Sequence, residues 1–257
     1  MISEAIRAHM SLVDVFTRWK AKAVRSLRKR GAAGTIAYAN AVAKRVLSNR
    51  RIDYRLDNSW YRYLDERFDR RFGVDTAGTV ERPDLQSDPR FKHSEQYDPT
   101  PRSLFFRMLR QLNVDYGKFV FIDFGCGKGK VLLLAAELPF KQIIGVELSS
   151  ELICVAAENL KSYVRRTRMS NVFHLNCMDA SEYRIPHEPA IFYFYNPFRA
   201  EVMRKVLENI RGSLAAAPRE IYLVYLNPVD RSLLDESGFL TPVKLTYWYS
   251  IHTVSEV

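Results

Sequence analysis

The sequence predicts an α/β fold in which helices cover a mostly parallel sheet, preceded by a helical N-terminal extension. From Thr100 onward, short and continuously apolar segments alternate with segments of helical periodicity, which is typical of strands buried in a parallel sheet. A glycine-rich turn follows the first apolar segment. The last two apolar segments have no helix between them, so they predict an antiparallel hairpin near the C-terminus.

The elements of this region follow one another in a regular order. The first helix is expected to have Thr100 as its N-cap and Pro101 as its first helical residue. Seven strands are expected at residues 119–124, 142–148, 172–175, 190–195, 220–226, 240–248 and 250–254. Helices are expected at residues 128–138, 150–168, 199–211 and 230–237. We therefore expect one domain over residues 100–257.

Residues 52–99 form a charged and aromatic segment, which we expect to be a lid or a lead-in to that domain. Trp60, Leu64, Phe68 and Phe72 recur every four residues and predict one apolar stripe on a helix that ends near Gly73. A helix that only packs on the domain is the simpler alternative.

Residues 1–51 form a basic helical arm. They carry 12 lysines or arginines and two acids, whereas the remaining residues carry 27 of each sign, so the net charge of +10 belongs to the arm. Three roles stay open for it: packing on the domain or on a partner, lying on a membrane surface, and binding RNA. The RNA contact would use Arg25, Arg28, Lys29 and Arg30.

Composition excludes several other classes of protein. No apolar run approaches the roughly 20 residues that span a bilayer, and the first residues lack the apolar centre of a signal peptide, so we expect a cytoplasmic protein. The three cysteines form no C-x-x-C pair, and the five histidines show no metal-ligand spacing. We therefore expect neither a disulfide framework nor a metal site.

The most informative stretch is residues 119–130, which read Phe-Val-Phe-Ile-Asp-Phe-Gly-Cys-Gly-Lys-Gly-Lys. An apolar strand is expected to run directly into Gly125, Gly127 and Gly129, and a helix to begin after them. Such glycines let backbone N–H groups approach a ligand closely at the carboxyl end of a strand. The stretch therefore predicts a ligand-binding loop.

The spacing of the glycines and the charge of nearby side chains limit the class of ligand that the loop can bind. A dinucleotide fingerprint would need glycine at position 130, which is Lys130, and a P-loop would need Ser or Thr where Val131 stands. The carboxylate of Asp123 would repel a phosphate but could receive a cationic amino group. S-adenosylmethionine carries an ammonium and a sulfonium and no phosphate. Glu147, at the end of the second strand, could then accept the ribose hydroxyls, and Asp179 the adenine amino group.

From Thr100 to the C-terminus the chain resembles the class I S-adenosylmethionine-dependent methyltransferases through its Asp-Phe-Gly-Cys-Gly-Lys-Gly motif. The resemblance implies a Rossmann-like seven-stranded sheet with a terminal antiparallel hairpin. It also implies contacts with the methionine part of the cofactor from Asp123, Gly125, Gly127 and Gly129. Glu147 would hold the ribose, and Leu148 and Asp179 the adenine. Cys126 lies within this loop and is therefore counted among the cofactor-binding residues, and we expect it to be a small packing residue rather than a nucleophile.

A second resemblance is to lysine methyltransferases of the disruptor-of-telomeric-silencing type and of the ATP synthase c-subunit type. It rests on Tyr97-Asp98-Pro99-Thr100-Pro101 before the first helix and on the run from Ile191 to Phe198. This resemblance implies that Tyr97 and Thr100 cap the cofactor.

The candidate catalytic residues end the fourth strand, in the order Asn196, Pro197 and Phe198. Asn196 would orient an acceptor nitrogen, and Phe198, with Tyr195 and Tyr97, would form an aromatic pocket. Enzymes that methylate exocyclic amines often have two prolines here, so the single proline disfavours nucleobase methylation. The alternative is that Asn196 only caps the helix that follows.

The sequence thus predicts an S-adenosylmethionine-dependent methyltransferase that acts on a protein side-chain amine, lysine first. RNA is the second substrate class, because of the basic arm, and small molecules also remain open. A catalytically inactive cofactor-binding scaffold is the non-enzyme alternative.

Overall fold

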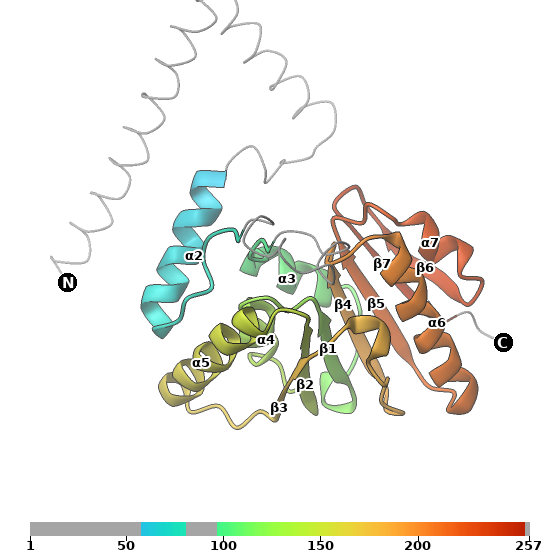
Figure 1. Cartoon of the computed structure of the whole chain (residues 1–257), viewed down its shortest axis with the longest axis horizontal. Coiled ribbons are helices and arrows are strands. Elements are labelled where there is room, and N and C mark those ends of the chain that lie inside the picture. The colour runs from blue at the N-terminus through green and yellow to red at the C-terminus, as the bar shows by residue number, and fades with distance from the viewer. Residues whose placement is uncertain (1–57, 81–96, 255–257) are drawn as a thin grey trace, which may run out of the picture. The chain divides into compact units, whose positions relative to one another are not determined.

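The computed structural model describes residues 58–80 and 97–254 (Figure 1). The predicted arm, residues 1–51, lies outside the described residues, as does part of the predicted lead-in segment. The division of the chain into residues 1–51, 52–99 and 100–257 therefore stays a prediction. In the part of the chain that the structure describes, no helix has both the length and the apolar character needed to cross a membrane.

The sheet has seven strands in the order β3-β2-β1-β4-β5-β7-β6. The first five strands pair in parallel, and β7 runs antiparallel to both β5 and β6. The predicted mostly parallel sheet with a C-terminal antiparallel hairpin is therefore confirmed. The strands are β1 (Val120–Phe124), β2 (Gln142–Glu147), β3 (Phe173–Cys177), β4 (Ala190–Tyr195), β5 (Ile221–Leu226), β6 (Leu240–Leu245) and β7 (Tyr249–Val254).

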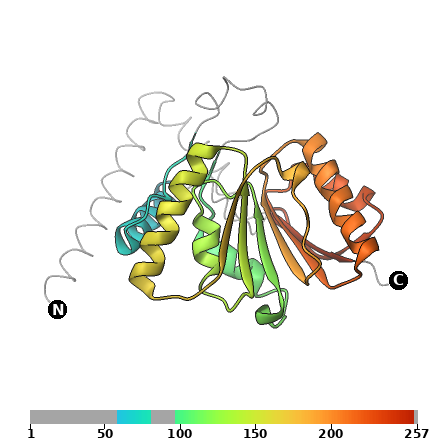
Figure 2. The same cartoon turned by 60° about the horizontal axis from the view of Figure 1, so that its bottom comes forward.

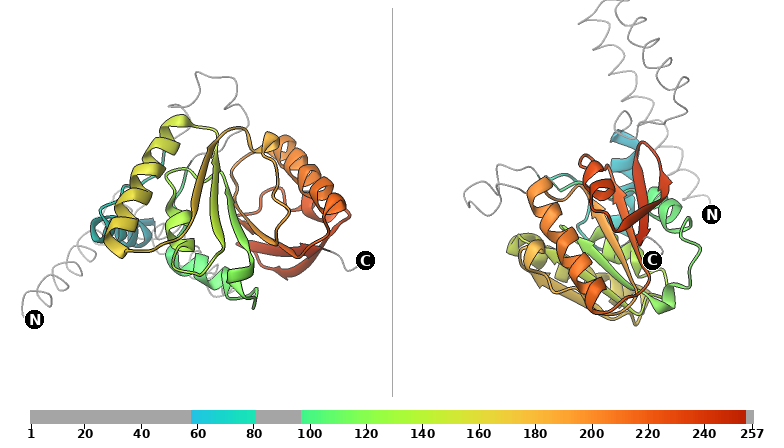
Figure 3. Two further views of the ribbon diagram at one scale, coloured as in Figure 1. Left: turned by 90° about the horizontal axis from the view of Figure 1, so that it is seen from below. Right: turned by 90° about the vertical axis from the view of Figure 1, so that its right-hand side faces the viewer.

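Helices cover both faces of this sheet, as Figures 2 and 3 show. One buried apolar cluster joins the sheet to α2, α3, α4 and α5, and a second joins its other face to α6 and α7. The strand β1 is apolar on both faces because it contributes side chains to both clusters. The helices are α2 (Asn58–Phe72), α3 (Arg102–Leu109), α4 (Lys130–Ala135), α5 (Ser150–Thr167), α6 (Ala200–Ala216) and α7 (Ser232–Glu236).

The start of α3 differs by one residue from the prediction. The helix begins at Arg102, and Pro101 holds the N-cap position. Thr100 does not cap the helix, because its buried hydroxyl lies 3.0 Å from the hydroxyl of Tyr193 on β4. This bond ties the segment before α3 to the centre of the sheet.

The strand order places a binding crevice in a defined position. After β1 the chain crosses to β2 on one side, whereas β4 lies on the other side of β1. Ligands of open parallel sheets bind at such a switch point, outside the carboxyl ends of the strands. The glycine loop follows β1, and Asn196 follows β4, so both lie at this edge.

A buried ion pair joins α2 to the helix that follows the glycine loop. Nζ of Lys130 lies 3.2 Å from Oδ1 of Asp65, and the two side chains are 1% and 8% exposed. Nζ also lies 3.9 Å from the ring centroid of Phe68 on α2, which is a favourable cation–π geometry. Burial raises the pKa of Asp65 to about 6 and lowers that of Lys130. Each charge thus depends on its partner to remain in the interior.

We predict that Asp65→Asn lowers the free energy of unfolding by about 3 kcal/mol, because it leaves a buried ammonium unpaired. Replacing the pair together, as Asp65→Leu with Lys130→Met, should restore most of the loss. Urea unfolding followed by circular dichroism measures both. Lys161→Ala is the matched control, because the Lys161–Glu158 pair is 72% exposed on both sides and its loss should cost at most about 0.5 kcal/mol. A loss for Asp65→Asn no larger than that of the control would contradict the account.

Candidate functional site

The glycine loop between β1 and α4 follows a path that side chains would obstruct. Gly125, Gly127 and Gly129 have φ angles of 78°, 51° and 80°, which is the left-handed region. A Cβ atom on Gly125 would lie 2.3 Å from Cβ of Pro197. A Cβ atom on Gly127 would lie 2.1 Å from Cδ2 of Tyr97. The loop therefore packs closely between Pro197, which follows β4, and Tyr97, which lies in the segment that leads into α3.

Hydrogen bonds hold this loop against the end of β2. The N–H of Gly125 donates to the backbone oxygen of Val146 at 2.8 Å. The N–H of Gly127 donates to Oε2 of Glu147 at 3.0 Å, and the N–H of Ser149 donates to Oε1 at 2.9 Å. Each carboxylate oxygen can accept a further bond. Glu147 thus fixes the loop and keeps acceptor capacity for a ligand.

Two carboxyl groups therefore gather at the ends of β1 and β2. Asp123 is 3% exposed, and burial, reinforced by the negative charge of Glu147, raises the pKa of its carboxyl well above the usual range. Burial also raises the pKa of Glu147, although the N–H groups that donate to it act in the opposite direction. A cation placed here would favour the charged carboxylates, and a phosphate would meet repulsion.

The segment after α2 contacts the glycine loop and α5. Oδ1 of Asn159 accepts from the N–H of Asp75 at 2.7 Å, and its Nδ2 donates to the backbone oxygens of Asp75 and Lys128 at 2.8 and 2.9 Å. Nζ of Lys128 lies 3.0 Å from Oδ1 of Asp75 and donates to the backbone oxygen of Ala77 at 3.3 Å. The lysine inside the loop is therefore bound to this segment, which agrees with the lack of a P-loop motif.

Tyr97 and Thr100, both predicted to cap the cofactor, have different surroundings. The hydroxyl of Tyr97 donates to the backbone oxygen of Thr76 at 2.8 Å, and its ring lies against Gly127. Thr100 is buried against Tyr193. Burial raises the pKa of the Tyr97 hydroxyl well above its usual value, and so do four nearby acids, Asp65, Asp69, Asp123 and Asp75. The site around Tyr97 is thus rich in carboxyl groups.

Asn196, Pro197 and Phe198 follow β4 directly. Asn196 has a left-handed φ of 42°, and its Oδ1 accepts from the hydroxyl of Tyr225 at 3.3 Å. The alternative that Asn196 caps the following helix is wrong, because α6 has Arg199 at its N-cap position and no side-chain cap. Phe198 is 7% exposed and belongs to the apolar cluster under α6. The structure therefore places Phe198 in the core and leaves Asn196 at the sheet edge.

The remaining predicted residues follow β1, β2 and β3. Leu148 is half-buried after β2. Oδ1 of Asp179 accepts from the N–H and the hydroxyl of Ser181 at 2.8 and 2.7 Å, so this carboxylate caps the short 3-10 helix η4 (Ala180–Glu182). Cys126 is buried, and burial raises the pKa of its thiol well above the usual value. A protonated, enclosed thiol fits the expected packing role.

Sequence reasoning missed Asp75, Asn159 and Asn227. Asp75 and Asn159 meet across 84 positions, so no local pattern links them. A signal did exist for Asn227, because an Asn-Pro dipeptide follows the fifth strand just as one follows the fourth.

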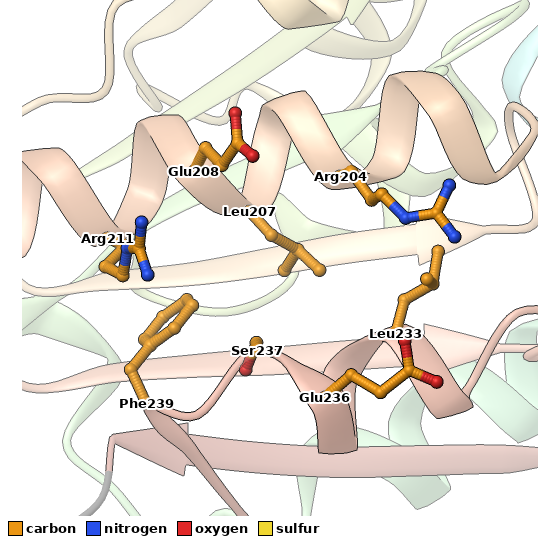
Figure 4. A pocket seen from close by; sticks show the side chains of 8 residues that line it. All are labelled: Arg204, Leu207, Glu208, Arg211, Leu233, Glu236, Ser237 and Phe239. Carbon is orange, nitrogen blue, oxygen red and sulfur yellow. The ribbon is translucent and has the colours of Figure 1, made fainter.

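A separate cavity of about 210 Å³ opens between α6 and α7 (Figure 4). It is lined by Arg204, Leu207, Glu208, Arg211, Leu233, Glu236, Ser237 and Phe239. None of these belongs to the glycine loop or to the predicted site. Within the described ranges, no three His, Cys, Asp or Glu side chains are grouped so that they could hold a metal ion.

Known proteins resemble the chain in part. No family model matches it. A protein-lysine N-methyltransferase of Saccharolobus islandicus is 36% identical over 66 residues, which are 25% of this chain and 40% of that protein. The match thus spans less than half the length of the curated relative.

Solved structures that match the chain in part include three methyltransferases. A precorrin-6Y C5,15-methyltransferase of Geobacter metallireducens is 16% identical with a TM-score of 0.44, over 62% of this chain and 90% of that one. An rRNA methylase of Streptococcus thermophilus is 12% identical with a TM-score of 0.40, over 59% and 95%. A magnesium protoporphyrin IX methyltransferase of Synechocystis, with bound S-adenosylmethionine, is 16% identical with a TM-score of 0.37, over 60% and 77%. By its sheet order and terminal hairpin, the chain has the class I methyltransferase fold that the sequence resemblance implies.

The packing of Tyr97 on the loop predicts unequal effects of two glycine substitutions. Gly127→Ala should destabilise the chain by about 3 kcal/mol, from the left-handed backbone and from overlap with the ring. Gly78→Ala should cost only about 1 kcal/mol, because Gly78 has a φ of 80° but no atom near the added Cβ. Adding Tyr97→Ala to Gly127→Ala removes the overlapping ring, so it should reduce the part of the stability loss at position 127 that exceeds the loss at position 78. Thermal unfolding of the three variants checks this. Equal losses of stability for Gly78→Ala and Gly127→Ala would contradict the close packing of Tyr97 on the loop.

Proposed function

We propose that this chain transfers the methyl group of S-adenosylmethionine to a protein side-chain amine, that of lysine. The observation that carries the proposal is the pairing of a left-handed glycine loop with two carboxyl groups, Asp123 and Glu147, at the ends of adjacent parallel strands. This arrangement offers close backbone approach together with negative charge. It suits a ligand that carries cationic groups and hydroxyls.

The residues present fit that cofactor. Asp123 would face the cationic methionine part beside the glycine loop, and Glu147 would accept the ribose hydroxyls with its remaining lone pairs. Leu148 would contact the adenine, and the second carboxylate oxygen of Asp179 would accept from its amino group. Tyr97, whose ring already lies on Gly127, would cover the loop side of the pocket. Because Lys128 is held by Asp75, a phosphate would find no free cation in the loop.

The transfer is a displacement in which the protein supplies alignment and an acceptor in the right protonation state. When bound, the sulfonium supplies an electrophilic methyl: the amine lone pair forms the N–C bond as the S–C bond breaks, sulfur keeps its electron pair, and the surplus amine proton passes to water. A lysine with an ordinary pKa must first lose a proton at a cost of about 4–5 kcal/mol at pH 7. Partial desolvation among Tyr97 and Tyr195 would lower that cost, whereas charged carboxylates near the amine would act in the opposite direction. The Oδ1 of Asn196, which Tyr225 already orients, would accept from the amine N–H.

Electrostatics favours lysine over RNA as the acceptor. Two lysines, Lys128 and Lys130, lie around Tyr97 and the loop, and both are paired with acids. The acids in the same region are Asp65, Asp69, Asp75, Asp123 and Glu147. In their charged form these carboxyl groups would attract a cationic side chain and oppose a phosphate backbone. The short match to a protein-lysine N-methyltransferase supports the same choice. The basic arm is the one feature that favours RNA.

The test is transfer of labelled methyl from S-adenosylmethionine into an extract of the expression host. We predict that the label enters protein, is released by protease and not by ribonuclease, and is recovered after hydrolysis as methylated lysine. Asn196→Gly should lower the initial rate about tenfold or more, because it keeps the left-handed backbone and removes the amide. Label released only by ribonuclease would replace lysine by RNA, and no transfer with intact cofactor binding would leave the scaffold alternative.

A further inference from the structure

Asn227 stands beside Asn196 at the carboxyl edge of the sheet. Strands β4 and β5 are parallel, and their last paired residues are Tyr195 and Leu226. The residue after each of these is an asparagine, and the residue after that is a proline. Two Asn-Pro dipeptides therefore end adjacent strands at the same level.

Both asparagines adopt the same unfavourable backbone conformation. Asn196 has a φ of 42° and Asn227 a φ of 51°, a left-handed region that non-glycine residues rarely adopt. A following proline further restricts the residue before it. At Asn227 the conformation is held by its N–H, which donates to the backbone oxygen of Trp248 at 2.7 Å, and by the N–H of Val229, which donates to its own backbone oxygen at 2.9 Å.

The side-chain amide of Asn227 is not used by the fold. It is half-buried, and among the residues that the structure describes no hydrogen bond to this amide is found. The neighbouring amide of Asn196 uses one lone pair of Oδ1 for Tyr225 and keeps the other. Each asparagine can therefore still accept a bond from a ligand at this edge.

The general spacing of neighbouring strands would place the two amides at a separation that suits one amine nitrogen. Neighbouring strands lie about 4.8 Å apart, and side chains of equal length that leave them at one level keep roughly that separation. A neutral amine whose two N–H groups donate at about 2.9 Å in tetrahedral directions needs its two acceptors about 4.7 Å apart. Its lone pair then points away from both acceptors.

We propose that Asn227 is a second acceptor-binding residue, which together with Asn196 holds both N–H groups of an unmethylated lysine amine. This inference rests on the proposed function and deepens it. An amine with one methyl retains one N–H for the pair, and an amine with two methyls retains none. The pair therefore favours the first transfer over the second, and the second over the third. Asn227 sets how many methyl groups are added.

The test uses the full-length chain, the same host extract and labelled S-adenosylmethionine, with mono-, di- and trimethyl-lysine separated after hydrolysis. Asn227→Gly removes the amide without adding backbone strain, because glycine adopts this φ freely. We predict that it slows formation of monomethyl-lysine by about three- to tenfold. The ratio of di- and trimethyl-lysine to monomethyl-lysine should rise, because later transfers lose less and gain room.

Asn113→Gly is the matched control. Asn113 has a φ of 50° and is exposed in the loop that follows α3, before β1, so the same substitution there should leave rates and product ratio unchanged. Wild-type rates and ratio for Asn227→Gly would overturn the proposal. So would a slower rate with an unchanged ratio, which marks a purely structural role. Lysine labelling by the wild type keeps these outcomes distinct from failure of the proposed function, in which the wild type itself labels no lysine.

Discussion

The close packing of the glycine loop between Tyr97 and Pro197 is the constraint on which the rest of the site depends. The loop keeps its left-handed path only because Gly125 and Gly127 have no Cβ, and in return Tyr97 and Pro197 approach its backbone directly. Three segments that are far apart in sequence, before α3, after β1 and after β4, thereby meet at one point. The switch in strand order at β1 brings them to the same edge of the sheet.

Burial controls the protonation of the two carboxyl groups beside the glycine loop. Asp123 and Glu147 lie at the ends of β1 and β2, and the pKa of each is raised because burial disfavours its charged form. The two lysines next to the loop glycines do not neutralise them, since Lys128 pairs with Asp75 and Lys130 with Asp65. These pairs also attach α2 and the segment after it to the loop. The result is a fixed loop beside two carboxyl groups that neither lysine pairs with and whose charged form a bound cation would favour. This is the physical basis for proposing a cationic cofactor and an amine acceptor.

Most of the fold was predictable, because its signals are local. Continuous apolar runs marked β1, β2, β4 and β5 to within one residue at each end, and the four-residue spacing of Leu64, Phe68 and Phe72 marked α2. The predicted start of α3 was wrong by one residue, because the Thr100 hydroxyl is hydrogen-bonded to Tyr193. No local sequence pattern reveals a partner so far along the chain. The ion pair of Lys130 with Asp65, like the bonds of Asn159 to the segment after α2, is also long-range and stayed hidden. Phe198 was predicted to line the acceptor pocket but lies in the core. An aromatic residue at a strand end is compatible with both positions.

Calorimetric titration with S-adenosylmethionine at a series of pH values measures whether the buried carboxyl groups at the ends of β1 and β2 receive a cationic ligand. Because burial raises the pKa of Asp123 in the free protein and a bound cation would lower it, binding should release protons. The affinity should therefore increase as the pH rises through the raised pKa and then level off. Buffers of different ionisation enthalpy measure the protons released, Glu147→Gln should bind more weakly, and NAD, with its two phosphates, should give no heat of binding. Binding of NAD, or binding of S-adenosylmethionine with no proton release and no dependence on pH, would contradict the account.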